Sequence, residues 1–394
     1  MRIALAGTRG VPAAYSGFET AVEQIGSRLV ARGHTVTVYC RPHMVGRRPD
    51  GTYRGMRLVY LPTVPGKHLD TPVHTLLSTV HLATVDRPDA VFYFIAGNSP
   101  FAGLGRALGV PTAINVDGLD SQRAKWGPLA RAYLRLTERA APSLACVAIT
   151  DSRTVQTLYR SWGHETVYIP YGSELDEDDA GAQESATGAG GGAAQSDGAL
   201  ARLGLEERGY VLFVGRLVPE NNAHVLVEAF RGLHTSMRLA VVGDAPYAGD
   251  YQARLRAAGD DRVVFAGYQF GAAYRELLRN AALVAVPTEV GGTHPVILEA
   301  LAAGACLVVN DHAPNLETVG DAGVSYRGAD GAEGLRRALE ALLADPGAVE
   351  RYRAAAVRRA RLYSWDAVTD AYERLAERLT EQRRGGRAVR RPAR

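Results

Sequence analysis

Short apolar runs alternate with longer amphipathic segments along most of the chain. The runs are four to seven residues long, as expected of buried strands, and the segments of ten or more residues between them carry apolar side chains at helical spacing. In the first half, this pattern predicts strands near residues 2–6, 35–40, 57–61, 89–95, 111–116 and 144–149. It predicts helices near residues 17–32, 72–85, 99–109, 128–141 and 151–162. Such alternation favours a parallel sheet with crossover helices.

The same pattern begins again at "YVLFVGRL", residues 210–217. It continues through the apolar runs "RLAVVGD", "RVVFAGY", "ALVAVPT" and "CLVVND", with a helical segment between successive runs. A chain of 394 residues is long enough for two cores of ordinary size. We therefore predict an α/β protein with two doubly wound Rossmann-like domains that face each other across a cleft.

Changes in composition give the expected domain boundaries. We predict an N-terminal domain at residues 1–174, a flexible low-complexity insert at 175–204, and a C-terminal domain at 205–362. The insert is rich in glycine, alanine, serine and acidic residues, which bury too little apolar surface to fold. Residues 363–382 form a helix whose broad apolar stripe has to pack on something, and we expect it to cross back to the N-terminal domain. The tail, residues 383–394, contains six arginines and is expected to be disordered.

Composition and charge exclude several classes of protein. No apolar stretch reaches the roughly 18 residues that cross a bilayer, and glycine and arginine interrupt the N-terminus too early for a signal peptide. We therefore expect a cytoplasmic protein, with the basic tail able to reach an anionic membrane surface. A net charge of +3 gives no reason to expect nucleic acid as a partner. The cysteines, Cys40, Cys146 and Cys306, each lie in an apolar run, so we expect reduced core residues that bind no metal.

Only two lysines, Lys67 and Lys125, occur in the chain. A P-loop needs a lysine in G-x-x-x-x-G-K-[ST], and neither lysine has that context, so a P-loop NTPase is excluded. Both lysines lie in predicted loops of the first half, which also argues against a pyridoxal-phosphate enzyme with a Schiff-base lysine.

The first predicted strand leads into a glycine-containing loop, "GTRGVPAAYSGFET". Its glycines, Gly7, Gly10 and Gly17, precede or begin a helix, where a phosphate would meet free N–H groups. A purely structural tight turn is the alternative. The spacing lacks G-x-G-x-x-G, and the next strand ends in Cys40-Arg41 instead of an acid, so a dinucleotide such as NAD is disfavoured.

The second half places a cation and an acid in corresponding loops. Arg216 follows a strand and its glycine, and its planar guanidinium suits a diphosphate. Residues 291–294, Gly-Gly-Thr-His, can expose consecutive N–H groups before a helix that begins near Pro295. Glu299, one turn inside that helix, can accept hydrogen bonds from the vicinal hydroxyls of a sugar or ribose. The alternative for Glu299 is an ordinary acid on the helix surface.

Taken together, these segments resemble a known family. The carriers, in order, are "GTRGVPAAYSGFET", "ARGHTVTVYCR", "GNSPF", "NVDGLDSQRAKWG", "IPYGSE", "VGRLVPENN", "VVGDAPYA", "EVGGTHPVILEALAAG" and "YSWDAV". They look like a GT-B glycosyltransferase of family 4, a group of retaining enzymes that use nucleotide sugars. Within it, the chain is similar to the bacterial polysaccharide rhamnosyltransferase-like group. The resemblance covers nearly all of residues 1–382.

The resemblance implies a nucleotide-diphospho-sugar donor held mainly by the C-terminal domain and a saccharide acceptor on the N-terminal domain. Arg216 matches the family's diphosphate-binding arginine, Glu299 its ribose-binding glutamate, and the loop through Gly17 a second phosphate cradle. The other residues expected on the donor side are Asn221, Gly243, Gly292, Thr293 and His294.

Three positions depart from the family pattern. Asn221 in "PENN" stands where many members have lysine, although "PENN" is typical of the rhamnosyltransferase-like group. Glu289 lies ten positions before Glu299, whereas the family's two glutamates are eight apart. Asp117 in "NVDGLD" stands where many members have a histidine that reaches the donor sugar. A 6-deoxy sugar lacks the hydroxyl that such a histidine binds, so dTDP-rhamnose is the preferred donor.

The implied reaction is metal-independent glycosyl transfer with retention at the anomeric carbon. Arg216 and two helix N-termini stabilise charge on the leaving diphosphate, and no D-x-D metal pair or other cofactor is expected. We assign the catalytic roles to Arg216, Asp117 and Glu299.

Polar residues of the first half are candidates for the acceptor or membrane side. They are Asp120, Arg123, Lys125 and Trp126. Asp120 could instead be a helix N-cap. The helix near 128–141 presents three arginines at a spacing of four, Arg131, Arg135 and Arg139, which suit either a solvated face or anionic lipid and a lipid-linked acceptor.

Two rival functions remain open at this point. A sugar-nucleotide epimerase can share the two-domain architecture, and it would change the donor without an acceptor. A non-catalytic sugar-nucleotide-binding protein would show no turnover.

Overall fold

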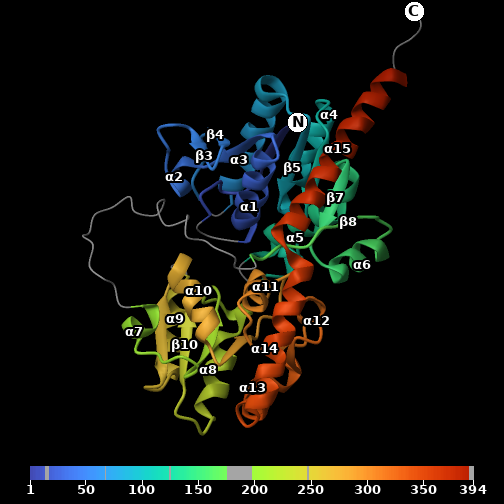
Figure 1. Ribbon diagram of the computed structural model, residues 1–394. Helices are drawn as coiled ribbons and strands as arrows, with labels where there is room; N and C mark the ends of the chain where they lie inside the picture. The colour runs from blue at the N-terminus through green and yellow to red at the C-terminus, as the bar shows by residue number, and fades with distance from the viewer. Residues whose placement is uncertain (14–16, 67, 124–125, 175–197, 246–247, 390–394) are drawn as a thin grey trace, which may run out of the picture. The chain divides into compact units, whose positions relative to one another are not determined.

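The computed structural model describes residues 1–13, 17–66, 68–123, 126–174, 198–245 and 248–389, with side chains as far as Arg383. These residues form two compact units (Figure 1). The first unit contains Met1–Gly172, Gly291–Thr293 and the chain from Trp365 onward. The second contains Ser173–Val290 and His294–Ser364.

The first unit is built on an eight-stranded sheet. Its strands are β1 (Arg2–Ala6), β2 (Thr35–Cys40), β3 (Thr52–Tyr53), β4 (Met56–Tyr60), β5 (Ala90–Phe94), β6 (Thr112–Asn115), β7 (Val147–Thr150) and β8 (Val167–Tyr168). Their order is β3-β4-β2-β1-β5-β6-β7-β8, and every pair is parallel except β3 with β4. All five side chains of β5 are buried, as expected of a central strand covered on both faces.

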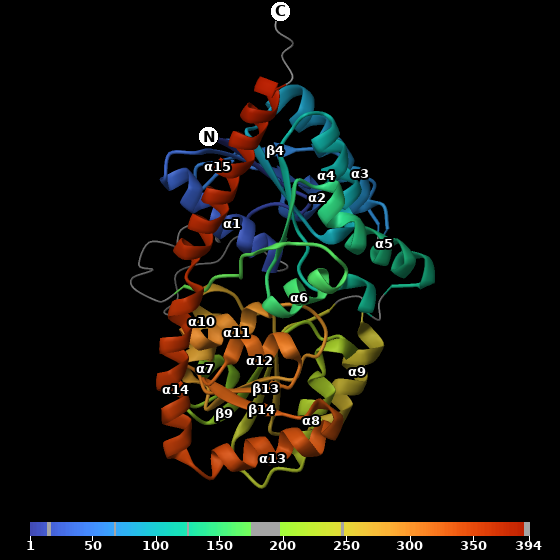
Figure 2. The ribbon, with the colours of Figure 1, turned by 90° about the vertical axis from the view of Figure 1, so that its right-hand side faces the viewer.

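Helices cover both faces of this sheet. They are α1 (Gly17–Ala31), α2 (Pro42–Val45), α3 (Asp70–His81), α4 (Ser99–Ala107), α5 (Pro128–Leu144), α6 (Arg153–Ser161) and α15 (Trp365–Val389), with short turns η1 (Leu82–Asp86), η2 (Ala96–Asn98) and η3 (Asp120–Gln122). Helices α4, α5 and α6 share one buried cluster with the strands, through Ala102, Ala141 and Tyr159. On the opposite face lie α1 and α15 (Figure 2). There the ring centroids of Tyr372 and Phe92 are 4.9 Å apart.

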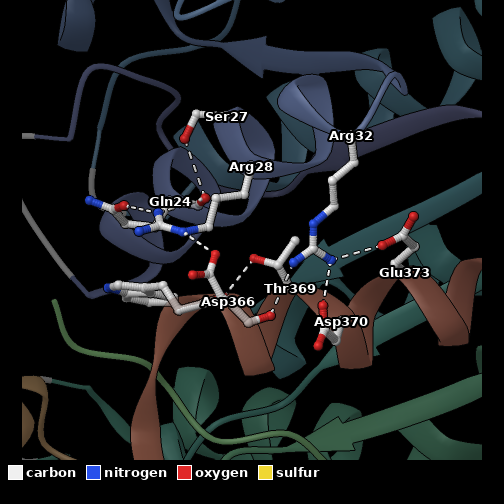
Figure 3. A network of polar contacts seen from close by, with 9 residues as sticks. Gln24, Ser27, Arg28, Arg32, Asp366, Thr369, Asp370 and Glu373 are labelled. Atoms are coloured by element: carbon white, nitrogen blue, oxygen red, sulfur yellow. Dashed lines mark hydrogen bonds and ion pairs between the residues drawn. The ribbon is translucent and has the colours of Figure 1, made fainter. Parts of the chain in front are cut away.

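Helix α15 is joined to α1 by ion pairs as well as by packing (Figure 3). Arg28 Nε lies 3.2 Å from Asp366 Oδ1, and Arg32 Nη1 lies 2.7 Å from Asp370 Oδ1 and 2.8 Å from Glu373 Oε2. The helix is longer than predicted, because residues 383–389, which we had expected to be a disordered tail, continue it to Val389. An established helix extends without a new nucleation cost, which explains this difference. Residues 390–394 of the expected tail lie outside the described residues.

The second unit is built on a six-stranded parallel sheet. Its strands are β9 (Tyr210–Val214), β10 (Arg238–Val242), β11 (Val263–Gly267), β12 (Leu283–Val286), β13 (Leu307–Asn310) and β14 (Gly323–Tyr326), in the order β11-β10-β9-β12-β13-β14. Its helices are α7 (Ala199–Leu203), α8 (Ala223–Arg231), α9 (Gly249–Ala258), α10 (Gly271–Asn280), α11 (Pro295–Ala302), α12 (Ala313–Val319), α13 (Gly331–Leu343) and α14 (Pro346–Ala360). Short turns are η4 (Pro219–Asn221), η5 (Gly328–Asp330) and η6 (Arg361–Tyr363).

Two separate buried clusters show how these helices cover the second sheet. One joins the strands to α8, α9 and α13, and the other joins them to α7, α10, α11 and α14. The predicted fold class, two doubly wound α/β units, is therefore confirmed.

The flexible insert predicted at residues 175–204 extends too far at its C-terminal end. Residues 199–203 form α7, with Ala199 buried and its N–H donated to Glu276 Oε2 over 2.8 Å. The sequence "ALARL" consists of strong helix formers, which explains the difference. Residues 175–197 of the expected insert lie outside the described residues.

One of the three cysteine predictions is wrong. Cys40 and Cys306 are buried, but Cys146 is exposed. It lies just before β7, where its side chain is exposed although that of the neighbouring Ala145 is buried.

Candidate functional site

Each sheet has one point at which neighbouring strands lead to loops that diverge. In the first sheet, β1 lies between β2 and β5, and in the second, β9 lies between β10 and β12. The chain winds away from the central strand in one direction and returns on its other side. Ligands of open α/β sheets bind at such points, outside the carboxyl ends of the strands. The predicted donor residues follow β9, β10 and β12, except Gly17, which begins the helix after β1.

Arg216 follows β9 and Gly215, in a turn whose close packing requires a glycine at position 243. Gly243, which follows β10, has φ of +129°, and a Cβ there would lie 1.9 Å from the carbonyl oxygen of Gly215. Asn221 Nδ2 donates a hydrogen bond to the carbonyl of Arg216 over 2.8 Å. Among the described residues, nothing forms a hydrogen bond or ion pair with the half-buried guanidinium of Arg216. The loop is thus fixed through its backbone, and its cation is left available for an anion.

Asn221 and His294, which we expected on the donor side, both form hydrogen bonds within the second unit. The Asn221 amide holds the backbone of Arg216. The His294 ring pairs through Nδ1 with Asn315 Oδ1 at 2.6 Å, and the amide nitrogen of Asn315 donates to the carbonyl of Thr288 over 2.8 Å. Both side chains therefore shape the loops after β9 and β12.

Glu299 lies on α11 with a tyrosine as its partner. Tyr274 of α10 donates its phenol proton to Glu299 Oε2 over 2.5 Å, and no donor among the described residues reaches Oε1. Burial raises the pKa of Glu299, the hydrogen bond from Tyr274 lowers it, and the nearby Glu174 raises it. The carboxylate is therefore oriented by one oxygen and keeps the other for a ligand hydroxyl. Glu289 is exposed in the loop after β12.

The first glycine loop is held by a side chain that the sequence did not single out. Asn98, buried at the end of η2, donates through Nδ2 to the carbonyl of Gly7 over 3.1 Å and to that of Phe94 over 2.8 Å. Gly7 has φ of +93°, and a Cβ there would lie 2.7 Å from Asn98 Nδ2. The segment "GNSPF" was noted only for its resemblance, and Asn98 is the residue of that segment that ties the loops after β1 and β5 together.

Two glutamates of α1 fasten the rest of this loop. Glu19 accepts the N–H of Arg9 at 3.1 Å, and Glu23 accepts the N–H of Ala13 at 2.7 Å. Gly17, the predicted phosphate-cradle residue, is the first residue of α1. Its N–H is therefore one of those that the first turn of a helix leaves without an intrahelical partner.

Asp117 lies at the end of β6 in a strained conformation. Its φ is +46°, which is uncommon for any residue other than glycine, and its own N–H bonds Asn115 Oδ1 at 3.1 Å. Strain of this kind is concentrated at functional sites.

A second aspartate, Asp151, follows β7 and was missed by the sequence analysis. It is 1% exposed, and its Oδ2 accepts the N–H of Thr293 at 2.7 Å, while Thr293 Oγ1 donates to the carbonyl of Asp151 over 3.0 Å. The Thr293 N–H, which we expected to face the donor, is thus bonded to Asp151. A Cβ on Gly292 would lie 2.6 Å from both Asp151 oxygens and 2.7 Å from Asp117 Oδ1, so glycine is required there as well.

On the predicted acceptor side, Asp120 is not a side-chain N-cap. Its Oδ1 lies 2.7 Å from Arg123 Nε. The neighbouring Ser121 donates its N–H and hydroxyl to Glu138, over 2.8 Å and 2.7 Å. The ring of Trp126 lies 6.1 Å from that of His68. Lys125 lies outside the described residues.

In the part of the chain that the structure describes, no helix has the length and apolar character needed to cross a bilayer. Within the same residues, no three His, Cys, Asp or Glu side chains gather as a metal site would require.

Two family models match the chain. One, described as a glycosyl transferase 4-like domain, matches residues 16–172, and the other, described as glycosyl transferases group 1, matches residues 208–345. D-inositol 3-phosphate glycosyltransferase from Salinispora tropica is 35% identical over 199 residues, which cover 46% of this chain and 41% of that protein. The match therefore spans less than half the length of this curated relative.

Solved structures with the same fold match nearly the whole chain. Sucrose-phosphate synthase from Thermosynechococcus elongatus has a TM-score of 0.80 and 21% identity, covering 97% of this chain and 99% of that one. Anabaena Alr3699/HepE in complex with UDP and glucose has a TM-score of 0.74 and 16% identity, covering 95% and 99%. The chain thus has the GT-B fold, and the family models for a glycosyl transferase 4-like domain and for glycosyl transferases group 1 match its first and second halves in that order.

Proposed function

We propose that this chain is a glycosyltransferase that transfers a sugar from a nucleotide-diphospho-sugar to a saccharide acceptor. The observation that carries the proposal is the guanidinium of Arg216, which lacks a partner among the described residues and follows the central strand β9. A fixed cation at the carboxyl edge of a parallel sheet suits a diphosphate. The same charge stabilises the diphosphate as it leaves, which is the main task of such a catalyst.

The donor's ribose is assigned to Glu299. Its Oε1 is reached by no described donor, while Tyr274 fixes Oε2. We propose dTDP-rhamnose as the donor, because Asp117 replaces the sugar-binding histidine of many related enzymes. We also propose that the transfer proceeds with retention at the anomeric carbon and without a metal. The HepE complexes with UDP and with UDP-glucose make uridine nucleotides the first alternative to test.

The acceptor is proposed to be a lipid-linked saccharide used in the synthesis of bacterial cell-surface polysaccharide. The support is the outer surface of α5, where Leu129 is 88% exposed and Leu136 is 68% exposed, beside the exposed Arg135 and Arg139. Glu138 is the one acid in the sequence of α5, and it is buried. Exposed leucines flanked by arginines suit a peripheral contact with an anionic lipid surface.

Vesicle binding tests this contact. Wild-type protein should sediment with vesicles that contain anionic phospholipid, and much less with neutral phosphatidylcholine or at high salt. The double variants Leu129→Ser/Leu136→Ser and Arg135→Gln/Arg139→Gln should lose binding, while Leu362→Ser/Arg358→Gln, at exposed positions of the second unit, should keep it. Equal binding by all variants would contradict the proposed contact.

A donor panel tests the function itself. Thermal unfolding should shift upward with a matching nucleotide sugar, since a ligand that binds only the folded state stabilises it in proportion to its affinity. The same donor should release its nucleotide in the presence of a saccharide acceptor. Conversion of the donor without an acceptor would favour an epimerase, and binding without turnover would favour a non-catalytic protein.

A further inference from the structure

Two carboxyl groups meet at the ends of β6 and β7. Asp117 follows β6 and Asp151 follows β7, and these strands are neighbours in the first sheet. Both carboxyl groups face the backbone of Gly292, where a Cβ would lie 2.6 Å from Asp151 and 2.7 Å from Asp117. They are therefore on the same side of this glycine and close to each other.

The facing oxygens lack donors. Asp117 Oδ1 and Asp151 Oδ1 are both buried, and no donor among the described residues reaches either of them. Two ionised carboxylates in this arrangement would leave two buried charges in contact without compensation. A single proton between them removes the repulsion and satisfies both oxygens.

We propose that Asp151 keeps this proton and uses it to donate a hydrogen bond to the Asp117 carboxylate. Asp151 is thereby a positioning residue for the transfer reaction. Its Oδ2 accepts the N–H of Thr293 at 2.7 Å. Its Oδ1, which no described donor reaches, is the oxygen that carries the proton toward Asp117. One neutral carboxyl group thus fixes the Asp117 carboxylate and residues 291–293 together. The positioning role of Asp151 in sugar transfer rests on the proposed function, whereas the protonation of Asp151 does not.

The electrostatics agree with this assignment. Burial raises the pKa of Asp151 well above its ordinary value, the adjacent Asp117 raises it further, and the N–H of Thr293 acts in the opposite direction. The titratable groups that face the pair are tyrosines, Tyr171 near both carboxyl groups and Tyr372 of α15 near Asp151. Burial raises the pKa of each phenol, so both remain neutral. Glu19 acts on Tyr171 from α1.

The shared proton explains why Asp117 can serve a ligand. Asp117 is only half-buried, so part of its carboxylate is accessible from outside the pair. A hydrogen bond from a neutral Asp151 orients that carboxylate and leaves it negative, and hence able to accept a hydrogen bond from a sugar hydroxyl. When Asp151 loses its proton, repulsion separates the two groups and the Asp117 carboxylate loses its hydrogen-bond donor.

The first test needs no substrate. A carboxyl group that keeps its proton in the folded state makes the chain less stable as pH rises, from the ordinary carboxyl pKa up to the raised one. One retained proton changes the unfolding equilibrium by up to about tenfold per pH unit. The Asp151→Asn variant retains a neutral donor to Asp117 and an acceptor for Thr293, so this pH-dependent loss should disappear from its denaturant unfolding curves.

Two controls make the result specific. Asp86 is also a buried aspartate, but it faces Arg57 at 2.9 Å, so Asp86→Asn should keep the pH slope of the wild type. The wild-type chain should also show, at neutral pH, an infrared carbonyl band of a protonated carboxyl group that Asp151→Asn lacks, since Glu299, whose pKa burial also raises, is present in both. An equal pH slope in wild type and Asp151→Asn, or the absence of that band, would overturn the proposal.

The pH profile of transfer supplies the functional readout. The wild type should lose kcat on the alkaline side, and Asp151→Asn should stay active to higher pH, whereas Asp151→Ala should lose kcat throughout. An unchanged alkaline limb in Asp151→Asn would contradict the positioning role. If no donor supports transfer, the proposed function fails, but the unfolding and infrared results still decide whether Asp151 carries the proton.

Discussion

Tyr274 donates its phenol proton to Glu299 Oε2 over 2.5 Å, so the carboxylate expected to bind ribose is oriented before any ligand arrives. The contact joins α10 to α11, and the positions are 25 residues apart. Preorganisation of this kind reduces the ordering cost that a ligand would otherwise impose.

The Tyr274→Phe variant tests this relationship. It removes a hydrogen bond worth about 1.5–3 kcal/mol to a charged group, part of which is recovered from water, so donor affinity should fall roughly tenfold. The hydrogen bond lowers the pKa of Glu299, and its loss raises that pKa, so the deficit should grow as pH falls. Calorimetric titration with the matching donor at two pH values measures both effects. An unchanged affinity would mean that Glu299 does not bind the donor.

The close packing of Gly243 against the carbonyl group of Gly215 leads to a second prediction. Gly243→Ala combines a left-handed φ of +129° with a Cβ 1.9 Å from a carbonyl oxygen, so it should lower the free energy of unfolding by about 1–3 kcal/mol and weaken donor binding through Arg216. Gly249 has open space around its Cβ position and no left-handed φ, so Gly249→Ala is the matched control. Denaturant unfolding measures the difference, and equal stability of the two variants would contradict the account of this turn.

The ion pairs that Arg32 and His34, just after α1, form with Glu373 of α15 predict an acid-dependent loss of stability. His34 and then Arg32 hold the pKa of Glu373 below its ordinary value, so this contribution is present above the unfolded-state pKa and is lost as pH falls through the lower, folded-state value. The pair is partly exposed, so its contribution should be only about 0.5 kcal/mol. Glu373→Gln should remove it at neutral pH and flatten the acid limb of the unfolding curve. A variant as acid-sensitive as the wild type would refute this.

Much of the fold follows from the periodicity of the sequence. The predicted strands at residues 2–6 and 35–40 match β1 and β2, and the predicted helix at 17–32 ends one residue beyond α1. The buried side chains of these elements recur at the regular spacing of a strand or a helix, and this periodicity is visible in a single sequence. The two-residue strands β3 and β8 were missed because their pairing depends on neighbouring strands and not on their own pattern.

The candidate site was less predictable, because its contacts join distant positions. Glycines and charged residues in loops after strands or at the start of a helix are visible in the sequence. Together with the family resemblance, they led to Arg216, Glu299 and Asp117. Asp151 gave no such signal, since "ITDSRT" reads as an ordinary helix start until Thr293, 142 positions away, is placed against it. Tyr274 gave no signal either, because its partner Glu299 lies 25 positions away.

The most direct test of the central claim is the rate of sugar transfer by Arg216→Ala with the donor that stabilises the wild type. Loss of a group that stabilises the departing charge should lower kcat by about 10²–10³-fold, with Arg216→Lys intermediate because lysine retains the charge but not the planar fork. Arg358→Ala, at an exposed position of α14, should transfer at the wild-type rate. If Arg216→Ala also transfers at the wild-type rate, Arg216 does not hold the diphosphate, and the proposed donor site is contradicted.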